Sequence, residues 1–141
     1  MNISKFTQKS VQAVQDLEKV AYEYGNQEVE QEHLLYALLT QEDSLILKLI
    51  EKMEINKDYF INTVKKALDA KVKVSGGDLR FGQYLNKSLV NAENEAKAMG
   101  DEYVSVEHLF LSLLTQPSPS MKKIFNEFGI TREDFSRHFQ L

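Results

Sequence analysis

A ten-residue stretch that occurs twice is the feature that most constrains the fold of this chain. The sequence EHLLYALLTQ begins at Glu32, and EHLFLSLLTQ begins at Glu107. When residues 21–41 are aligned with residues 96–116, ten of the 21 positions are identical, whereas ordinary residue frequencies give roughly one or two by chance. The same offset of 75 residues pairs phenylalanines on both sides of this region without any insertion. The chain is therefore predicted to be a tandem duplication.

Apolar residues in both copies recur at the three- and four-residue spacing of a helix with one buried face. Such a stripe runs over residues 14–24 in the first copy and over residues 85–99 in the second. A glycine follows each stripe, Gly25 in the first copy and Gly100 in the second, and glycine is common just past the end of a helix. Both copies are therefore predicted to contain a long amphipathic helix.

Three further helices are predicted in each copy. Ser105 is a favourable N-cap for a helix over residues 107–115, whereas its counterpart Glu30 is a poorer one. The shorter helices are expected at residues 44–53, 56–70, 120–128 and 131–140. No segment sustains the alternation of a strand, because a Ser-Gly-Gly-Asp run ends the brief alternation of residues 71–74. The predicted fold class is all-α.

These helices predict one domain with internal symmetry. Repeat 1 covers about residues 3–70, a linker covers about 71–80, and repeat 2 covers about 81–141. A repeat of this size has a marginal core on its own, so the two copies are expected to pack together and bury both apolar stripes. The prediction is a single eight-helix domain over residues 1–141, made of two pseudo-symmetric four-helix repeats, with a groove along the seam between them.

Composition and charge narrow the class of function. The chain is 43% hydrophobic and 27% charged, which is typical of a compact soluble domain. A net charge of -4 without any basic run argues against a nucleic-acid partner. There is no cysteine, which fits a reducing compartment, so we expect a cytoplasmic location. No run approaches the roughly 20 apolar residues that span a bilayer, so neither membrane insertion nor export is indicated.

A nucleotide site is not predicted. Residues 77–82 supply the two glycines of a phosphate-binding loop at the right separation. Gln83 and Tyr84 follow, however, where the loop needs a lysine for the phosphates and a hydroxyl for magnesium. We interpret this stretch as part of the linker.

The histidines are interpreted as structural. Neighbouring residues on a helix point about 100° apart, so Glu32 and His33 cannot share one metal ion as residues four apart can. His33 and His108 are instead expected to pack or to cap the first helical turn, and no metal site is predicted. No Gly-x-Ser-x-Gly elbow accompanies the serines near His108. A small stand-alone enzyme that uses the two Glu-His pairs stays open as the alternative from a different class.

Two interpretations of the duplicated glutamates stay open. At the first turn of a helix, Glu32 and Glu107 are stabilised by the helix dipole by about 0.3–1 kcal/mol, and this alone can account for them. Their recurrence at equivalent places would otherwise give two matched acidic sites for cationic ligands. The leucines of both motifs are expected to belong to the core.

The duplicated pattern Gly-x-x-x-Val-x-x-Glu-His-Leu-x-x-x-Leu-Leu resembles the amino-terminal domain of the Clp/Hsp100 AAA+ unfoldases, the ClpA, ClpB and ClpC group. The resemblance covers both repeats, from Phe6 to Phe139. Residues 104–106, which precede the second Glu-His pair, and the Val-Ser-Gly-Gly of residues 74–77 look more like the ClpB disaggregase type than the ClpC protease-partner type.

The resemblance implies a non-catalytic domain that sits on a hexameric ATP-driven ring and gives substrates or adaptors their first contact. Unfolded or aggregated proteins and adaptor proteins are the implied partners. The isolated domain is expected to be monomeric and the parent protein hexameric. ATP and magnesium are implied only for the ATPase modules, so no cofactor is expected in this domain.

For ClpB-type members the resemblance implies a groove between the repeats that takes unfolded apolar segments. The positions tied to substrate handling fall on Thr7, Asp101 and Glu107 in this sequence. Extended apolar peptides are expected to bind weakly at the seam, where Thr7 is joined by apolar side chains near the linker. These side chains are Leu79, Phe81, Tyr84 and Leu85, with a core position as the alternative for Phe81.

For ClpC-type members the resemblance implies that the glutamate of each Glu-His pair reads phosphorylated arginine on proteins marked for degradation. These glutamates are Glu32 and Glu107 here. A carboxylate fits the guanidinium end of that ligand. This sequence departs from the ClpC pattern at Gln31 and Val106, which stand where a threonine precedes each glutamate. The ClpB-type interpretation is therefore preferred, with the phosphoarginine interpretation as its alternative.

Overall fold

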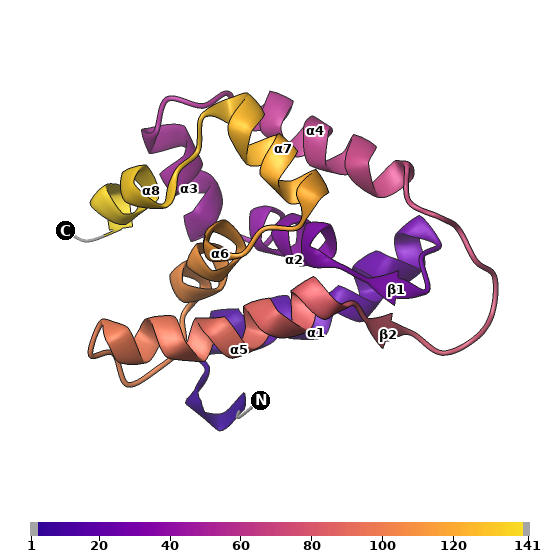
Figure 1. Ribbon diagram of the computed structural model, residues 1–141, viewed down its shortest axis with the longest axis horizontal. Helices are drawn as coiled ribbons and strands as arrows, with labels where there is room; N and C mark the ends of the chain where they lie inside the picture. Colours follow the sequence, from indigo (N-terminus) through magenta and orange to yellow (C-terminus); the bar gives the residue numbers. More distant parts are fainter. Residues whose placement is uncertain (1–2, 140–141) are drawn as a thin grey trace.

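The computed structural model describes residues 3–139, and helices dominate it (Figure 1). The first repeat contains α1 (Gln8–Tyr24), α2 (Gln31–Leu39), α3 (Leu45–Lys52) and α4 (Lys57–Asp69). The second contains α5 (Gln83–Ala98), α6 (Val106–Thr115), α7 (Pro119–Phe128) and α8 (Arg132–Phe139). A short 3-10 turn, η1 (Ile3–Lys5), precedes α1. The all-α class, with four helices in each repeat, is confirmed for the described residues, and Gln140 at the end of the last predicted helix lies outside them.

The ends of the two long helices follow the sequence signals. Thr7 caps the start of α1, where its Oγ1 accepts a hydrogen bond from the Ser10 N–H at 3.3 Å. Gly25 ends α1 with a left-handed φ of 70°, and Gly100, its repeat mate, has a φ of 73° just beyond α5. A side chain would be strained at such a φ, so both helices end where the apolar stripes predicted.

Two short strands, absent from the all-α prediction, pair across the seam. β1 (Glu28–Val29) and β2 (Arg80–Phe81) form a parallel pair with their second residues opposite each other. A separate parallel bridge joins Phe6 to Val104. The 75-residue offset converts the first pairing into the second, so each repeat lends an extended segment to the other. Two residues are too few to show the alternation that identifies a strand in a sequence, which is why the pairing was not predicted.

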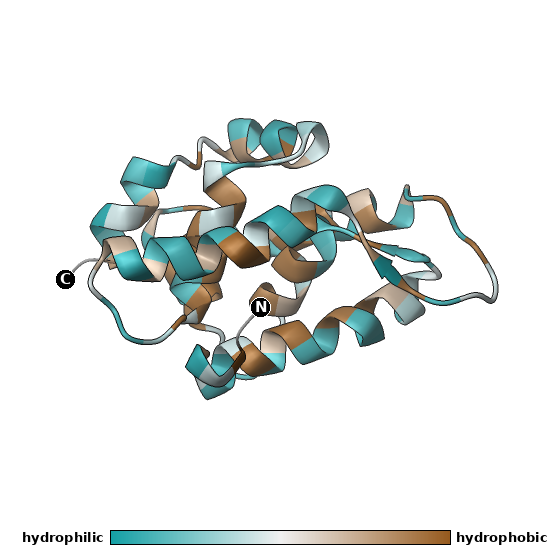
Figure 2. Cartoon of the chain, turned by 60° about the horizontal axis from the view of Figure 1, so that its bottom comes forward, coloured by the Kyte–Doolittle hydropathy of each residue, from teal (hydrophilic) through white to brown (hydrophobic). Residues whose placement is uncertain are grey.

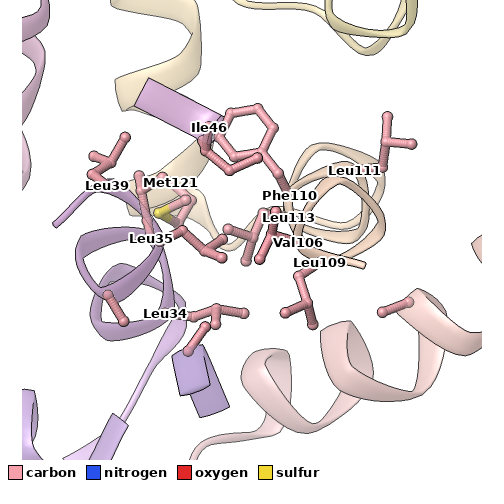
Figure 3. Close-up of a cluster of buried hydrophobic side chains, with 14 of the residues drawn as sticks. Leu34, Leu35, Leu39, Ile46, Val106, Leu109, Phe110, Leu111, Leu113 and Met121 are labelled. Carbon is pink, nitrogen blue, oxygen red and sulfur yellow. The ribbon is translucent and has the colours of Figure 1, made fainter. Parts of the chain in front are cut away.

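The two copies of the duplicated motif, α2 and α6, form the centre of the core. Figure 3 shows side chains from both helices converging, among them Leu34 and Leu35 of α2 and Leu109 and Leu113 of α6. These four leucines are fully buried. The prediction that the leucine-rich runs belong to the core is confirmed, although Leu114 is only partly buried.

Helices of the two repeats interlock. α1 packs on α2 of its own repeat and also on α6, while α5 packs on α6 and also on α2. Further contacts join α3 to α8 and α4 to α7. Hydrophobic and hydrophilic residues alternate along the helices in Figure 2, as amphipathic helices around a shared core require. Among residues 3–139, no helix combines the length and the apolar character needed to cross a membrane.

The linker leaves α4, swings around one end of the molecule and returns to β2 (Figures 1 and 2). Its first part is tied to the end of α1 by one backbone hydrogen bond and one from a side chain. The Val74 N–H donates to the Gly25 carbonyl at 2.9 Å, and Asn26 Nδ2 donates to the Val72 carbonyl at 3.1 Å. These contacts hold the linker against the first repeat and direct Lys71 toward the start of α2.

Candidate functional site

Thr7 and Glu107, which belong to different repeats, line one groove at the seam. This groove, called the open groove below, has a volume of about 360 Å³. It lies between the first turn of α1, the loop before α3 and the first turn of α6. Leu45, which is 42% exposed, and Val106 supply apolar side chains. The structure thus brings together two of the predicted site residues beside an accessible apolar surface.

Backbone and side-chain hydrogen bonds fix Thr7 at the edge of the open groove. Its N–H donates to the Val104 carbonyl at 2.9 Å, and its hydroxyl donates to Ser10 Oγ at 3.0 Å. Ser10 Oγ also lies 2.7 Å from the Val104 carbonyl oxygen. Thr7 therefore joins the start of α1 to the segment that precedes α6, so the two walls of the groove are held in register.

Glu107 is the uncompensated charge of the open groove. Its side chain is partly exposed, and within residues 3–139 no hydrogen bond or ion pair engages its carboxylate. The other charged groups nearby are turned elsewhere. Lys9 Nζ donates to the Glu42 carbonyl at 2.7 Å, and Asp43 pairs with Lys48 at 2.7 Å. A negative charge beside an apolar wall favours a ligand that is itself apolar and cationic.

The second groove of the seam is the twofold mate of the first and is much smaller. It has a volume of about 190 Å³ and is called the sealed groove below. Gly82 takes the place of Thr7, and Gln31 takes the place of Val106. Gln31 is 1% exposed and hydrogen-bonds across the seam, so the amide occupies space that the valine leaves free.

Glu32, the repeat mate of Glu107, is buried in an ion pair. Its side chain is 2% exposed, and Oε1 lies 3.3 Å from Lys71 Nζ. Ser120 Oγ donates to its Oε2 at 2.5 Å, and Lys71 also bonds Glu30 Oε2 at 2.9 Å. Burial alone would lower the pKa of Lys71, but the carboxylates of Glu32 and Glu30 raise it overall. Of the two interpretations left open for the glutamates, the matched pair of acidic sites does not fit the structure, because the linker supplies Lys71 to only one of them.

The predicted apolar residues near the linker do not gather around Thr7. Leu85 is fully buried, and Phe81 lies in β2, partly buried against the core. Tyr84 is 42% exposed but lines the sealed groove. Leu79 borders a different hollow, between the linker and the end of α1. The expectation of one groove that combines Thr7 with these four side chains is therefore wrong, and Leu85 is unavailable to a ligand because the core encloses it.

Asp101 belongs to a helix-start motif that both repeats share. In the second repeat the Ser105 N–H donates to His108 Nδ1 at 2.9 Å, so His108 Nε2 carries the hydrogen and donates to Asp101 Oδ2 at 2.9 Å. In the first repeat, the Glu30 N–H donates to His33 Nδ1 and His33 Nε2 donates to Asn26 Oδ1, each at 2.9 Å. The prediction that the histidines cap their helices is confirmed.

The third member of this motif was not anticipated as a histidine partner. Asn26 and Asp101 are separated by the 75-residue offset and directly follow the two helix-ending glycines. This equivalence of position is the sequence signal that could have identified both as histidine partners. In the first repeat, burial lowers the pKa of His33 to about 4, and the nearby Lys71 adds to this effect. His33 is therefore neutral in the folded chain near pH 7. Among residues 3–139, no three His, Cys, Asp or Glu side chains lie close enough to hold a metal ion.

Comparisons with known proteins converge on one family. The profile of the Clp repeat (R) N-terminal domain matches residues 5–132. The chaperone protein ClpB of Nitratidesulfovibrio vulgaris is 39% identical over 139 residues, which are 94% of this chain and 16% of that protein. This chain thus corresponds to about one sixth of the length of that relative.

Solved structures of other N-terminal domains share this fold. The N-terminal domain of Hsp104 from Candida albicans superposes with a TM-score of 0.82 at 21% identity, covering 95% of this chain and 88% of that one. A ClpV N-domain solved in complex with a VipB peptide superposes with a TM-score of 0.75 at 22% identity, covering 99% of this chain and 87% of that one.

Proposed function

Because the chain belongs to the Clp repeat N-terminal domain family, we propose that it is a non-catalytic recognition domain that binds segments of client polypeptide in the open groove. In the parent protein, a ClpB-type Hsp100 disaggregase, the domain would pass unfolded or aggregated clients to a hexameric ATPase ring in the cytoplasm. ATP and magnesium would bind only in the ATPase modules of that parent. Adaptor proteins would bind the domain through the same kind of surface.

One observation carries this proposal: Glu107 is a carboxylate without a partner among the described residues, and it lies beside the exposed Leu45. Leu45, which is 42% exposed, offers apolar surface to a client side chain, Val106 lies beneath it with 5% exposure, and Thr7 fixes the opposite edge. An extended client segment can bury an aliphatic side chain there and place a lysine or arginine near Glu107. The ClpV N-domain that was solved in complex with a VipB peptide supports peptide binding by this fold.

The phosphoarginine function remains the second candidate, because a carboxylate such as Glu107 suits a guanidinium group. It is less well supported than client binding. Lys71 and Ser120 already engage Glu32, so one of the two acidic positions is occupied from within. The phosphate would also need cationic or N–H donors, and the ammonium group of Lys9, which lines the groove, is directed at a backbone carbonyl.

Equilibrium binding tests the proposal. A short fluorescein-labelled peptide of leucine, lysine and serine is titrated with the domain, and fluorescence anisotropy reports the complex. We expect a dissociation constant of ~10–1000 μM, because ordering a flexible peptide offsets much of the gain from burial. Glu107→Gln should weaken binding about tenfold, the scale of one charge-assisted hydrogen bond. Glu102→Gln, which removes an exposed carboxylate outside the groove, is the matched control and should bind as the wild type does.

Two outcomes would contradict the client-binding proposal. Absence of any saturable anisotropy change would remove it, and equal weakening by Glu107→Gln and Glu102→Gln would show only a general effect of net charge. A parallel titration with phosphoarginine separates the second candidate, because binding that depends on both Glu32 and Glu107 would favour the ClpC-type function.

A further inference from the structure

We propose that residues 31 and 106, which are repeat mates, decide which groove of the seam accepts a client segment. Gln31 seals one groove and Val106 keeps the other open, so the domain has one client site although its fold has two equivalent positions. This inference rests on the proposed client-binding function.

Three hydrogen bonds across the seam explain how Gln31 seals its groove. Its Nε2 donates to Ser88 Oγ of α5 at 2.8 Å and to the Gln116 carbonyl at 2.9 Å. Its Oε1 accepts from the Ser118 N–H at 2.8 Å. One buried amide therefore fastens the start of α2 to α5 and to the loop between α6 and α7. Because both of its amide hydrogens and its oxygen are used, a ligand entering here would have to leave buried polar groups unpaired.

The open groove has the same frame without this fastening. The offset of 75 residues places Val106 at the position of Gln31, and it places Ala13, Gln41 and Asp43 at the positions of the three partners. A valine side chain has no hydrogen-bonding group, and Ala13 has no hydroxyl to match that of Ser88. The loop before α3 is therefore not pinned to the start of α6, and the groove is about 360 Å³ instead of about 190 Å³.

The charges at the two positions, like the volumes of the two grooves, favour the open groove as the client site. In the sealed position, Lys71 of the linker lies 3.3 Å from Glu32 and already neutralises it. At the open position, no described residue does this for Glu107. Glu32 thus already has a cation from its own chain, whereas Glu107 can pair with one from a ligand. The occupant that fits is an extended segment with an aliphatic side chain against Leu45, above the nearly buried Val106, and a lysine beside Glu107.

Exchanging the two residues tests the inference. Val106→Gln should recreate the seal, so that the peptide of leucine, lysine and serine binds at least about tenfold more weakly. Gln31→Val combined with Lys71→Ala, which removes the cation that neutralises Glu32, should open the second groove and raise the peptide stoichiometry from one to two. Val90→Gln, which places the same amide at a 57% exposed position on α5, is the matched control and should bind one peptide with unchanged affinity.

Hydrogen exchange gives a second measurement that does not depend on any peptide. The hydrogen-bonded side-chain amide of Gln31 and the Ser118 N–H should be protected in the wild type. In Val106→Gln, the new side-chain amide and the Asp43 backbone N–H should become protected in the same way. If the wild type binds no peptide, the proposed client-binding function is wrong. The seal by Gln31 is still tested in that case, because hydrogen exchange measures it without a peptide.

Three results would overturn the inference. The first is that the side-chain amide introduced by Val106→Gln exchanges as fast as the one introduced by the control Val90→Gln. The second is that the amide introduced by Val106→Gln is protected while the variant still binds the peptide with wild-type affinity. If Val106→Gln does not fold, the double variant of Gln31→Val and Lys71→Ala decides alone, and a folded double variant that still binds a single peptide is the third.

Discussion

Identical residues at mate positions have different surroundings in this protein, and the difference originates in single side chains. Glu32 and Glu107 begin the same ten-residue pattern, yet one is buried against Lys71 and the other faces a groove. The linker passes only one copy of the motif within the described chain, so it pairs only Glu32. The motif itself could be found in the sequence, whereas the environment of each glutamate could not.

Replacement of each glutamate by glutamine should separate structure from recognition. Glu32→Gln should lower the free energy of unfolding by about 1–3 kcal/mol, because Lys71 and Ser120 lose a buried charged partner. Glu107→Gln should change it by at most about 1 kcal/mol, the scale of an exposed charge at a helix start. Urea denaturation of both variants measures this, and an equal loss of stability would show that the two carboxylates are alike after all.

At the scale of helices, the second repeat contains a polar tie that the first lacks. Glu95 of α5 receives hydrogen bonds from Arg132 Nη2 at 2.7 Å and from Thr115 Oγ1 at 2.8 Å. Burial alone would raise the pKa of Glu95, but the hydrogen bonds from Arg132 and Thr115 lower it overall. The tie joins α5, α6 and α8. Val20, the repeat mate of Glu95, has no carboxylate that could make it.

This tie predicts a dependence of stability on pH. The folded pKa of Glu95 lies below its unfolded value, so its contribution is complete above the ordinary glutamate pKa and is lost as the pH falls through the folded pKa. Below about pH 4.5, Glu95→Gln should therefore lose stability on acidification less steeply than the wild type. Denaturation curves at pH 7 and in this acidic range test it, with the exposed Glu18→Gln as the control. Parallel pH profiles for Glu95→Gln and wild type would contradict the assignment.

Across the whole molecule, the duplication makes each repeat dependent on the other. α1 packs on α6 and α5 packs on α2, and two strand pairings cross the seam. The core residues of α2 and α6 meet one another in Figure 3. One repeat alone would leave these faces in water, at a cost of roughly 25 cal/mol for each Å² of apolar surface.

Residues 1–74 expressed alone should therefore fail to fold cooperatively. Their thermal melt, followed by circular dichroism, should be broad and start from low helicity, whereas residues 1–141 should melt in one sharp transition. A sharply melting half would show that the seam contributes little to stability.

The architecture was accessible from sequence and the site was accessible only in part. The offset of 75 residues and the helical stripes predicted the repeats and their helices, because amphipathic spacing depends on local order. The cross-seam strands were missed since two residues show no pattern. Thr7 and Glu107, which the resemblance singled out, line one groove, and their role in binding stays a prediction. Leu85 was misplaced because the spacing of an apolar residue in a helix is the same whether it faces a core or a groove. The seal by Gln31 could not be predicted because its partners are 57 to 87 residues away in the sequence.

The central claim is that one seam groove, between Thr7 and Glu107, receives the client. Nuclear magnetic resonance of the isotope-labelled domain tests it directly, with backbone shifts followed as the peptide of leucine, lysine and serine is added. The account predicts saturable shifts that cluster at Thr7, Leu45 and Val106, with a stoichiometry of one. Shifts that centre instead on Tyr84 and the sealed groove, or a wild-type stoichiometry of two, would contradict it.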